Sequence, residues 1–150
     1  MRIAVVGEGE LMALTDKQIE QEREFLKGIP RFNLAAFLLP PLWGPVYGYW
    51  ITILFYPAWL FMDNMLYGVY ADPTPLTCIL AALVCITYVA FCVAFSLVSQ
   101  PMAYHRAHAK GVSKEKYLKQ QRIWAVASVV ITLVMLATAT YYNLEIRTEI

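Results

Sequence analysis

Two histidines come closest to recognisable chemistry in this sequence, His105 and His108 in the segment YHRAHAK. A spacing of three residues puts both imidazoles on one side of a helix, where neutral rings can ligate a metal or a haem. Two ligands are too few for a closed zinc site, and the nearest cysteine, Cys92, is about 20 Å away along a continuous helix. Metal or redox chemistry at these histidines is therefore a minor alternative, and we expect no metal and no cofactor.

The three cysteines, Cys78, Cys85 and Cys92, recur at a regular spacing of seven residues, and Ser99 continues the series. Seven residues make almost two helical turns, so these four side chains lie along one face. Successive cysteines are about 10.5 Å apart along a helix, beyond the roughly 7 Å limit between the Cα atoms of a disulfide. The pattern favours a seam of small residues for close helix packing, with a redox or metal role as the alternative.

No nucleophile elbow, phosphate-binding loop or carboxylate pair occurs in the chain. We therefore expect no catalytic residue, and nothing nominates an enzyme. The net charge is +1, so a general attraction to nucleic acid is not expected either.

The elements that carry these residues are apolar and long. Residues 32–62 form an uncharged run, and apolar segments follow at 76–99 and 123–142. A helix needs about 20 apolar residues to cross a bilayer, and a hydrophobic content of 59% exceeds that of soluble domains. We expect an all-α integral membrane protein with three transmembrane helices, at about 46–62, 76–99 and 123–142, in a membrane domain of residues 32–143.

Prolines break the first of these runs. Pro40 and Pro41 remove backbone donors, so a helix that begins near Phe32 should end near Leu38, too short to cross. Two arrangements remain: a short interfacial or re-entrant helix within 32–45 that precedes the span, which we favour, or one sharply kinked span. Backbone groups freed at membrane depth need polar partners. Segment 38–48 is thus a candidate membrane crevice, with residues Asn33, Pro40, Pro41, Trp43, Gly44 and Pro45.

Basic residues alternate along the chain in a way that predicts its topology. Five Lys and Arg precede residue 32, six lie between Arg106 and Arg122, and segment 63–75 has none. The positive-inside rule puts segment 1–31, with a helix near 15–27, in the cytoplasm together with loop 104–122. Within that loop, Ser113 is expected to cap a helix KEKYLKQQ that runs straight into the third span. Segment 63–75 and the tail 144–150 are then external. The basic loop is expected to contact anionic lipid headgroups through Arg106, Lys110, Lys114, Lys116, Lys119 and Arg122.

The stretch RFNLAAFLLPPLWGPVYG resembles the entry motif of a family of small bacterial inner-membrane proteins of unknown function, in which N-x-A-A-F leads to P-x-W. The matching residues are Asn33, Ala35, Ala36, Phe37, Pro41 and Trp43. The double proline and Gly44-Pro45 depart from the family pattern, so a straight first span is in doubt. The resemblance implies the bacterial inner membrane and implies no catalytic residue.

Three functions remain as hypotheses. The first is a non-enzymatic accessory or interaction subunit, which binds a larger membrane protein or itself through the small-residue face that carries Cys78, Cys85, Cys92 and Ser99. The second is a transport subunit with segment 38–48 lining a crevice. The third is a membrane redox subunit that uses His105 and His108. No span has a charged residue in its interior, which counts against ion-coupled transport.

Overall fold

The computed structural model describes residues 16–149, and this part of the chain is helical without a strand. The expected all-α class is therefore confirmed. The elements in chain order are α1 (Asp16–Phe25), α2 (Leu34–Leu38), α3 (Pro40–Val46), the 3₁₀ segment η1 (Trp50–Leu54), α4 (Phe55–Ala71), α5 (Pro75–Ala109), α6 (Lys114–Tyr141), the π-helical turn η2 (Tyr142–Ile146) and the 3₁₀ turn η3 (Arg147–Glu149).

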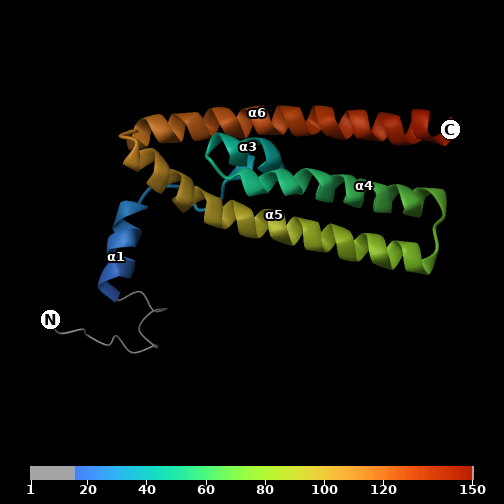
Figure 1. Cartoon of the computed structure of the whole chain (residues 1–150), viewed down its shortest axis with the longest axis horizontal. Coiled ribbons are helices and arrows are strands. Elements are labelled where there is room, and N and C mark those ends of the chain that lie inside the picture. The colour runs from blue at the N-terminus through green and yellow to red at the C-terminus, as the bar shows by residue number, and fades with distance from the viewer. Residues whose placement is uncertain (1–15, 150) are drawn as a thin grey trace.

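Three long helices, α4, α5 and α6, alternate in direction, with α4 between the other two in the view of Figure 1. α4 packs against α5, and it shares a lining of side chains with α6 further along. α5 and α6 are joined by the short turn 110–113, yet they contact each other little, because α2 lies between them and contacts both. α1 projects away from the end of the molecule at which α5 meets α6 (Figure 1).

The segment between α1 and η1 folds back on itself, and we call α2, α3 and the turn 47–49 the wedge hairpin. Leu39 is both the C-cap of α2 and the N-cap of α3, with φ −133° and ψ 59°. Pro40 and Pro41 occupy the first two positions of α3, where a helix needs no N–H donors. The prolines thus end α2 at Leu38, as predicted, and also begin the next helix.

The two ends of the wedge hairpin lie at one level of the long helices. Gln121 on α6 accepts a hydrogen bond from Asn33 at one end and donates one to Tyr47 at the other. The tip, at Leu38 and Leu39, instead reaches a small cavity beside Tyr88 in the middle of α5. The hairpin therefore enters between α5 and α6 and returns toward the same end.

Local sequence signals set the ends of the long helices. Thr74 forms a capping box with Thr77 ahead of α5, and Pro75 occupies the first turn of that helix. Ser113 caps α6 through a bond from the Lys116 N–H. Gly111 has a φ of +73°, which a residue with a side chain rarely adopts, so it allows the sharp turn between α5 and α6.

The buried core is small and lies near that turn. It comprises Ala35, Ala36, Trp43, Ala103, Tyr104 and Tyr117. Elsewhere α5 and α6 expose most of their Ile, Leu, Val and Phe side chains. The helical stretches Pro75–Ala109 and Lys114–Ile146 are long and apolar enough to cross a membrane, and at most 11% of their most apolar windows is buried. Unlike the core helix of a soluble protein, these helices direct their apolar side chains outward.

Several expected boundaries require correction. The helix expected at 46–62 is interrupted by the turn 47–49 and by η1, and the regular helix α4 extends from Phe55 to Ala71. Most of the expected loop 63–75 is therefore helical. Asp63 is accommodated inside α4 because Asn143 donates a hydrogen bond to its carboxylate (2.9 Å).

The other expected boundaries also differ, because the helices continue beyond their apolar segments into polar sequence. The expected basic loop 104–122 shrinks to the turn 110–113. The tail 144–150 is helical up to residue 149. The helix expected at 15–27 is found at Asp16–Phe25, and its first expected residue, like residue 150, lies outside the described part of the chain.

Candidate functional site

A cluster of neutral polar side chains is buried where the wedge hairpin meets α5 and α6. It consists of Asn33, Ser96, Gln100 and Gln121, each at most 9% exposed, and we call it the polar latch. A buried polar group without a partner destabilises a fold, whereas a fully bonded network fixes one arrangement. The bonds within the polar latch therefore decide its role.

Asn33 is the centre of the polar latch. Its main-chain N–H donates to Ser96 Oγ (3.0 Å), and its carbonyl accepts from the same hydroxyl (2.8 Å). Its Nδ2 donates to Gln100 Oε1 (2.7 Å) and to Gln121 Oε1 (3.3 Å). Its Oδ1 accepts from the N–H of Ala36 (3.0 Å) and so caps α2. One residue thus ties the start of the wedge hairpin to both long helices.

Two tyrosines extend the network. Gln121 Nε2 donates to the Tyr47 hydroxyl (2.8 Å), and the Tyr117 hydroxyl donates to the main-chain oxygen of Gln100 (3.3 Å). Burial raises the pKa of Tyr47 above its ordinary value, and the hydrogen bond from Gln121 opposes that shift. The polar latch contains no nucleophile next to a base, so its geometry suits holding the hairpin rather than a reaction.

Arg106 on α5 covers the turn of the wedge hairpin. Its Nη1 donates to the Tyr47 carbonyl (2.8 Å), and its guanidinium carbon lies 4.0 Å from the centre of the Tyr49 ring. Gly48, between the two tyrosines, has a φ of +83°, and a Cβ atom there would lie 2.5 Å from Arg106 Nη1. Glycine therefore supplies both the backbone conformation of the turn and the room for the guanidinium.

The residues predicted to form a crevice are instead mostly packed against other parts of the chain. Trp43 is fully buried, stacks on Tyr47 at 4.4 Å between ring centres, and has an indole N–H without a hydrogen-bond partner in the described part of the chain. A Cβ atom on Gly44 would lie 1.9 Å from Thr52 Oγ1. Asn33 and Pro40 are also buried, and Pro41 and Pro45 are half-buried. The cavity beside Pro41 measures only about 40 Å³.

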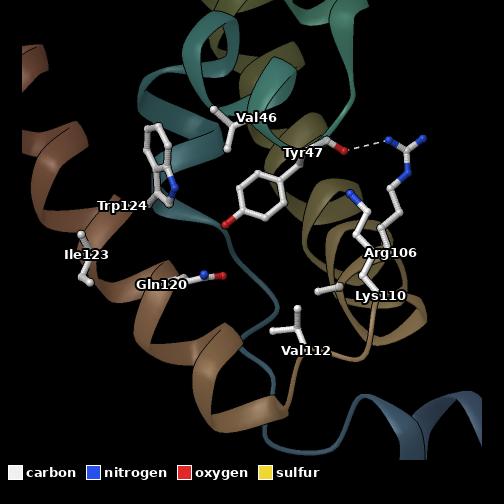
Figure 2. A pocket seen from close by; sticks show the side chains of 9 residues that line it. Val46, Tyr47, Arg106, Lys110, Val112, Gln120, Ile123 and Trp124 are labelled. Carbon is white, nitrogen blue, oxygen red and sulfur yellow. Dashed lines mark hydrogen bonds between the residues drawn. The ribbon is translucent and has the colours of Figure 1, made fainter.

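A larger cavity opens beside the turn of the wedge hairpin, with a volume of about 330 Å³. Arg106 and Lys110 reach this region from α5, Gln120 and Trp124 lie across from them on α6, and the Tyr47 ring lies between (Figure 2). The remaining lining residues are Val46, Ala107, Val112 and Ile123. The cavity is therefore basic on one wall and largely apolar on the other.

The predicted cysteine seam changes its surroundings along α5. Cys78 is exposed, Cys85 is half-buried, and Cys92 and Ser99 are buried. The buried end lies in the half of α5 against which the wedge hairpin packs. The seam thus packs within the chain near Ser99, and only its Cys78 end is open to another molecule.

The two histidines lie beside α1 rather than around a shared site. Phe25 stacks on His105 (4.5 Å between ring centres) and presents an edge to His108 (5.1 Å). The Nε2 atom of His105 lies 2.7 Å from a carboxylate oxygen of Glu22. Within residues 16–149, no group of three or more His, Cys, Asp or Glu side chains is placed to hold a metal.

The six basic residues expected to contact lipid headgroups separate into three sets. Arg106 and Lys110 line the cavity of Figure 2. Lys114 donates to the carbonyl of Lys27, next to α1. The others are exposed on α6: Lys116, Lys119 and Arg122.

Most of the polar latch was missed from the sequence, although Asn33 was expected to matter. Ser96 and Gln100 are four residues apart near the end of an apolar run, and Tyr117 and Gln121 repeat that spacing at the start of α6. Polar residues at helical spacing beside apolar segments would have indicated a polar stripe. Gln121 is not singled out by the sequence because it closes the basic stretch KEKYLKQQ, whose polar residues are expected to be solvated.

Comparison with protein-family models, with curated proteins and with solved structures finds no match to this chain.

Proposed function

We propose that this chain is an integral protein of the bacterial inner membrane that crosses the bilayer three times, through α4, α5 and α6. The apolar exposure of α5 and α6 supports this placement, because lipid tails can cover side chains that water would not. α4 has 17 residues, about 25 Å of helix, and η1 adds to its length. The wedge hairpin is then a re-entrant element that penetrates from one side.

In this arrangement the charges define the two sides. Arg106, Lys110, Arg122 and α1 lie at the end of the bundle where the wedge hairpin opens, which we assign to the cytoplasm. Asp63, in the middle of α4, lies with Asn143 and Arg147 in the other half of the bundle, linked through Asn143, which donates to Asp63 and accepts from Arg147 (3.3 Å). We place this half toward the external side, with the N-terminus inside and the C-terminus outside.

Within the membrane, the chain acts as a non-enzymatic accessory or interaction subunit. The observation that carries this proposal is the polar latch, whose neutral side chains hydrogen-bond to one another and to backbone rather than facing a substrate-sized space. A hairpin fixed in this way holds α5 and α6 apart and defines the outward faces that they present. The resemblance of the Asn33 to Trp43 motif to small bacterial inner-membrane proteins supports the membrane placement.

The partner, a larger membrane protein or a second copy, is proposed to bind the open end of the cysteine seam. Ala82 lies next to Cys78 and Cys85 and is exposed, so a second helix can approach closely there. Phe91 is also exposed, but it lies nine residues further along α5, on the opposite face. These two positions form a matched pair for a crosslinking test.

The test places a photo-crosslinking residue at position 82 or at position 91 of the full chain in native membranes. We expect a discrete protein adduct from position 82, weakened by Cys85→Leu, and no protein adduct from position 91. Equal adducts from both positions, or none from position 82, would refute an interaction through the seam.

A further inference from the structure

The cavity beside the wedge hairpin has the lining of a ligand site rather than of a packing gap. Its volume of about 330 Å³ is at the lower end of the range for small-molecule pockets. It is formed by three separate elements, because Val46 and Tyr47 come from the hairpin, Arg106 and Lys110 from α5, and Trp124 from α6. The wedge hairpin creates this space by keeping α5 and α6 apart.

The basic wall of the cavity is not neutralised by the chain. No Asp or Glu lines it. The Lys110 ammonium has no hydrogen-bond or ion-pair partner within residues 16–149. Arg106 donates one hydrogen bond, from Nη1 to the Tyr47 carbonyl. Residues four apart on a helix project from the same side, and both Arg106 and Lys110 line the cavity. An anion bound in the cavity can accept charge-assisted hydrogen bonds from these two cations. No acidic side chain of the cavity competes for them.

The opposite wall favours an amphiphile over a free anion. Val46, Val112 and Ile123 are apolar, and Trp124 adds an aromatic ring of the kind found at the headgroup level of membranes. Tyr47 offers a ring face toward the same space (Figure 2). A ligand that fits both walls carries a phosphate at one end and hydrocarbon at the other.

We propose that this cavity binds the headgroup phosphate of one anionic phospholipid molecule, held by Arg106 and Lys110 and packed against Trp124. The inference rests on the membrane placement proposed above, with this end of the bundle at the cytoplasmic surface. It differs from a general attraction of the basic patch to lipid, because Lys116 and Lys119 do not line the cavity. Basic pockets between helices on this side of a membrane bind anionic headgroups in other proteins.

The test measures lipid bound per chain by native mass spectrometry of the full protein released from mild detergent. Phosphatidylglycerol is titrated, with phosphatidylcholine and inorganic phosphate as separate arms. We expect one phosphatidylglycerol per chain at the lowest concentrations, and Lys110→Gln should weaken it by about tenfold, as expected for a lost charge-assisted bond. Lys119→Gln removes the same charge outside the cavity and should change the affinity by less than about twofold.

Two further variants keep the test decisive. Ile123→Trp fills the cavity without altering a charge and should also weaken binding, whereas Arg106→Lys keeps the charge and should retain most of it. Equal losses from Lys110→Gln and Lys119→Gln would overturn the proposal in favour of an unspecific patch. Equal binding of phosphatidylcholine would overturn it as well, and so would displacement of the lipid by millimolar inorganic phosphate. A wrong topology would appear independently, as a change in the side from which the turn 110–113 can be labelled.

Discussion

Replacing Asn33 by alanine should destabilise the fold more than any comparable change at an exposed polar residue. The loss of the α2 cap costs about 1 kcal/mol. Gln100 Oε1, which is buried, loses its donor at 2.7 Å, and an unpaired buried acceptor costs about 1–3 kcal/mol. The bonds of Ser96 to the Asn33 backbone remain. We therefore expect a loss of about 2–4 kcal/mol in the free energy of unfolding.

A series at this position separates the two contributions. Asn33→Ser keeps an oxygen for the cap but loses the amide donors, so it should cost less than Asn33→Ala. Asn33→Asp also keeps the cap but places a carboxylate opposite the amide oxygens of Gln100 and Gln121, so it should cost more than either. The control is Asn64→Ala, an exposed asparagine whose side chain donates to the Leu60 carbonyl and accepts from Arg147.

The assay is reversible unfolding in mixed micelles with increasing SDS mole fraction, followed by tryptophan fluorescence and circular dichroism. Asn64→Ala should change the free energy of unfolding by less than about 1 kcal/mol. If Asn33→Ala and Asn33→Asp were no more destabilising than this control, the polar latch would not hold the wedge hairpin.

Three other substitutions have defined outcomes. Gly44→Ala should prevent the close packing of α3 on η1, because the new Cβ would lie 1.9 Å from Thr52 Oγ1. The yield of monodisperse protein on size-exclusion chromatography should fall sharply. The second substitution Thr52→Ala should restore part of that yield. Gly48→Ala should cost about 1–2 kcal/mol from the φ of +83° alone and should also displace Arg106, as seen in faster proteolysis of the turn in detergent. Thr74→Ala removes the capping box of α5 and should cost about 1 kcal/mol in the SDS unfolding assay, with normal topology.

Part of this structure could be predicted from the sequence because it depends on local signals. The length of the apolar segments predicted the helices α5 and α6. Because proline lacks an N–H, Pro40 and Pro41 predicted that α2 ends at Leu38. What could not be predicted is that Pro40 and Pro41 begin a second helix that turns back. That outcome depends on the tertiary space between α5 and α6, which no local pattern describes.

The errors in helix boundaries have a common physical origin. A charged residue is expected to end a membrane helix, yet Asp63 continues α4, and Asn143, 80 residues later, donates to its carboxylate. The expected loop 104–122 is largely helical as well, although the helix predicted to begin after Ser113 is confirmed, since α6 begins at Lys114 with Ser113 as its cap. The polar latch was missed for the same reason, since Gln121 acquires its partners only when the wedge hairpin is in place.

The candidate site in the structure lies beside the segment with the prolines, not within it. The segment around Trp43 and Gly44 was expected to line a crevice, but these residues are buried against the chain itself. An opening larger than the cavity beside Pro41 lies at the turn that follows, next to Arg106. Sequence indicated the chemistry of Arg106 and Lys110, namely contact with anionic headgroups, without indicating that only these two of the six basic residues share a cavity.

The central claim is that the wedge hairpin enters and leaves on one side of the membrane, so that α4 is the first crossing. The most direct measurement is labelling of single cysteines by a membrane-impermeant maleimide from each side of oriented inner-membrane vesicles, in a variant without the three native cysteines. Cysteines at Arg31, at Trp50 and at Glu115 should be labelled from the same, cytoplasmic side, and one at Pro73 from the other side. Labelling of position 50 from the side that labels position 73 would contradict the account.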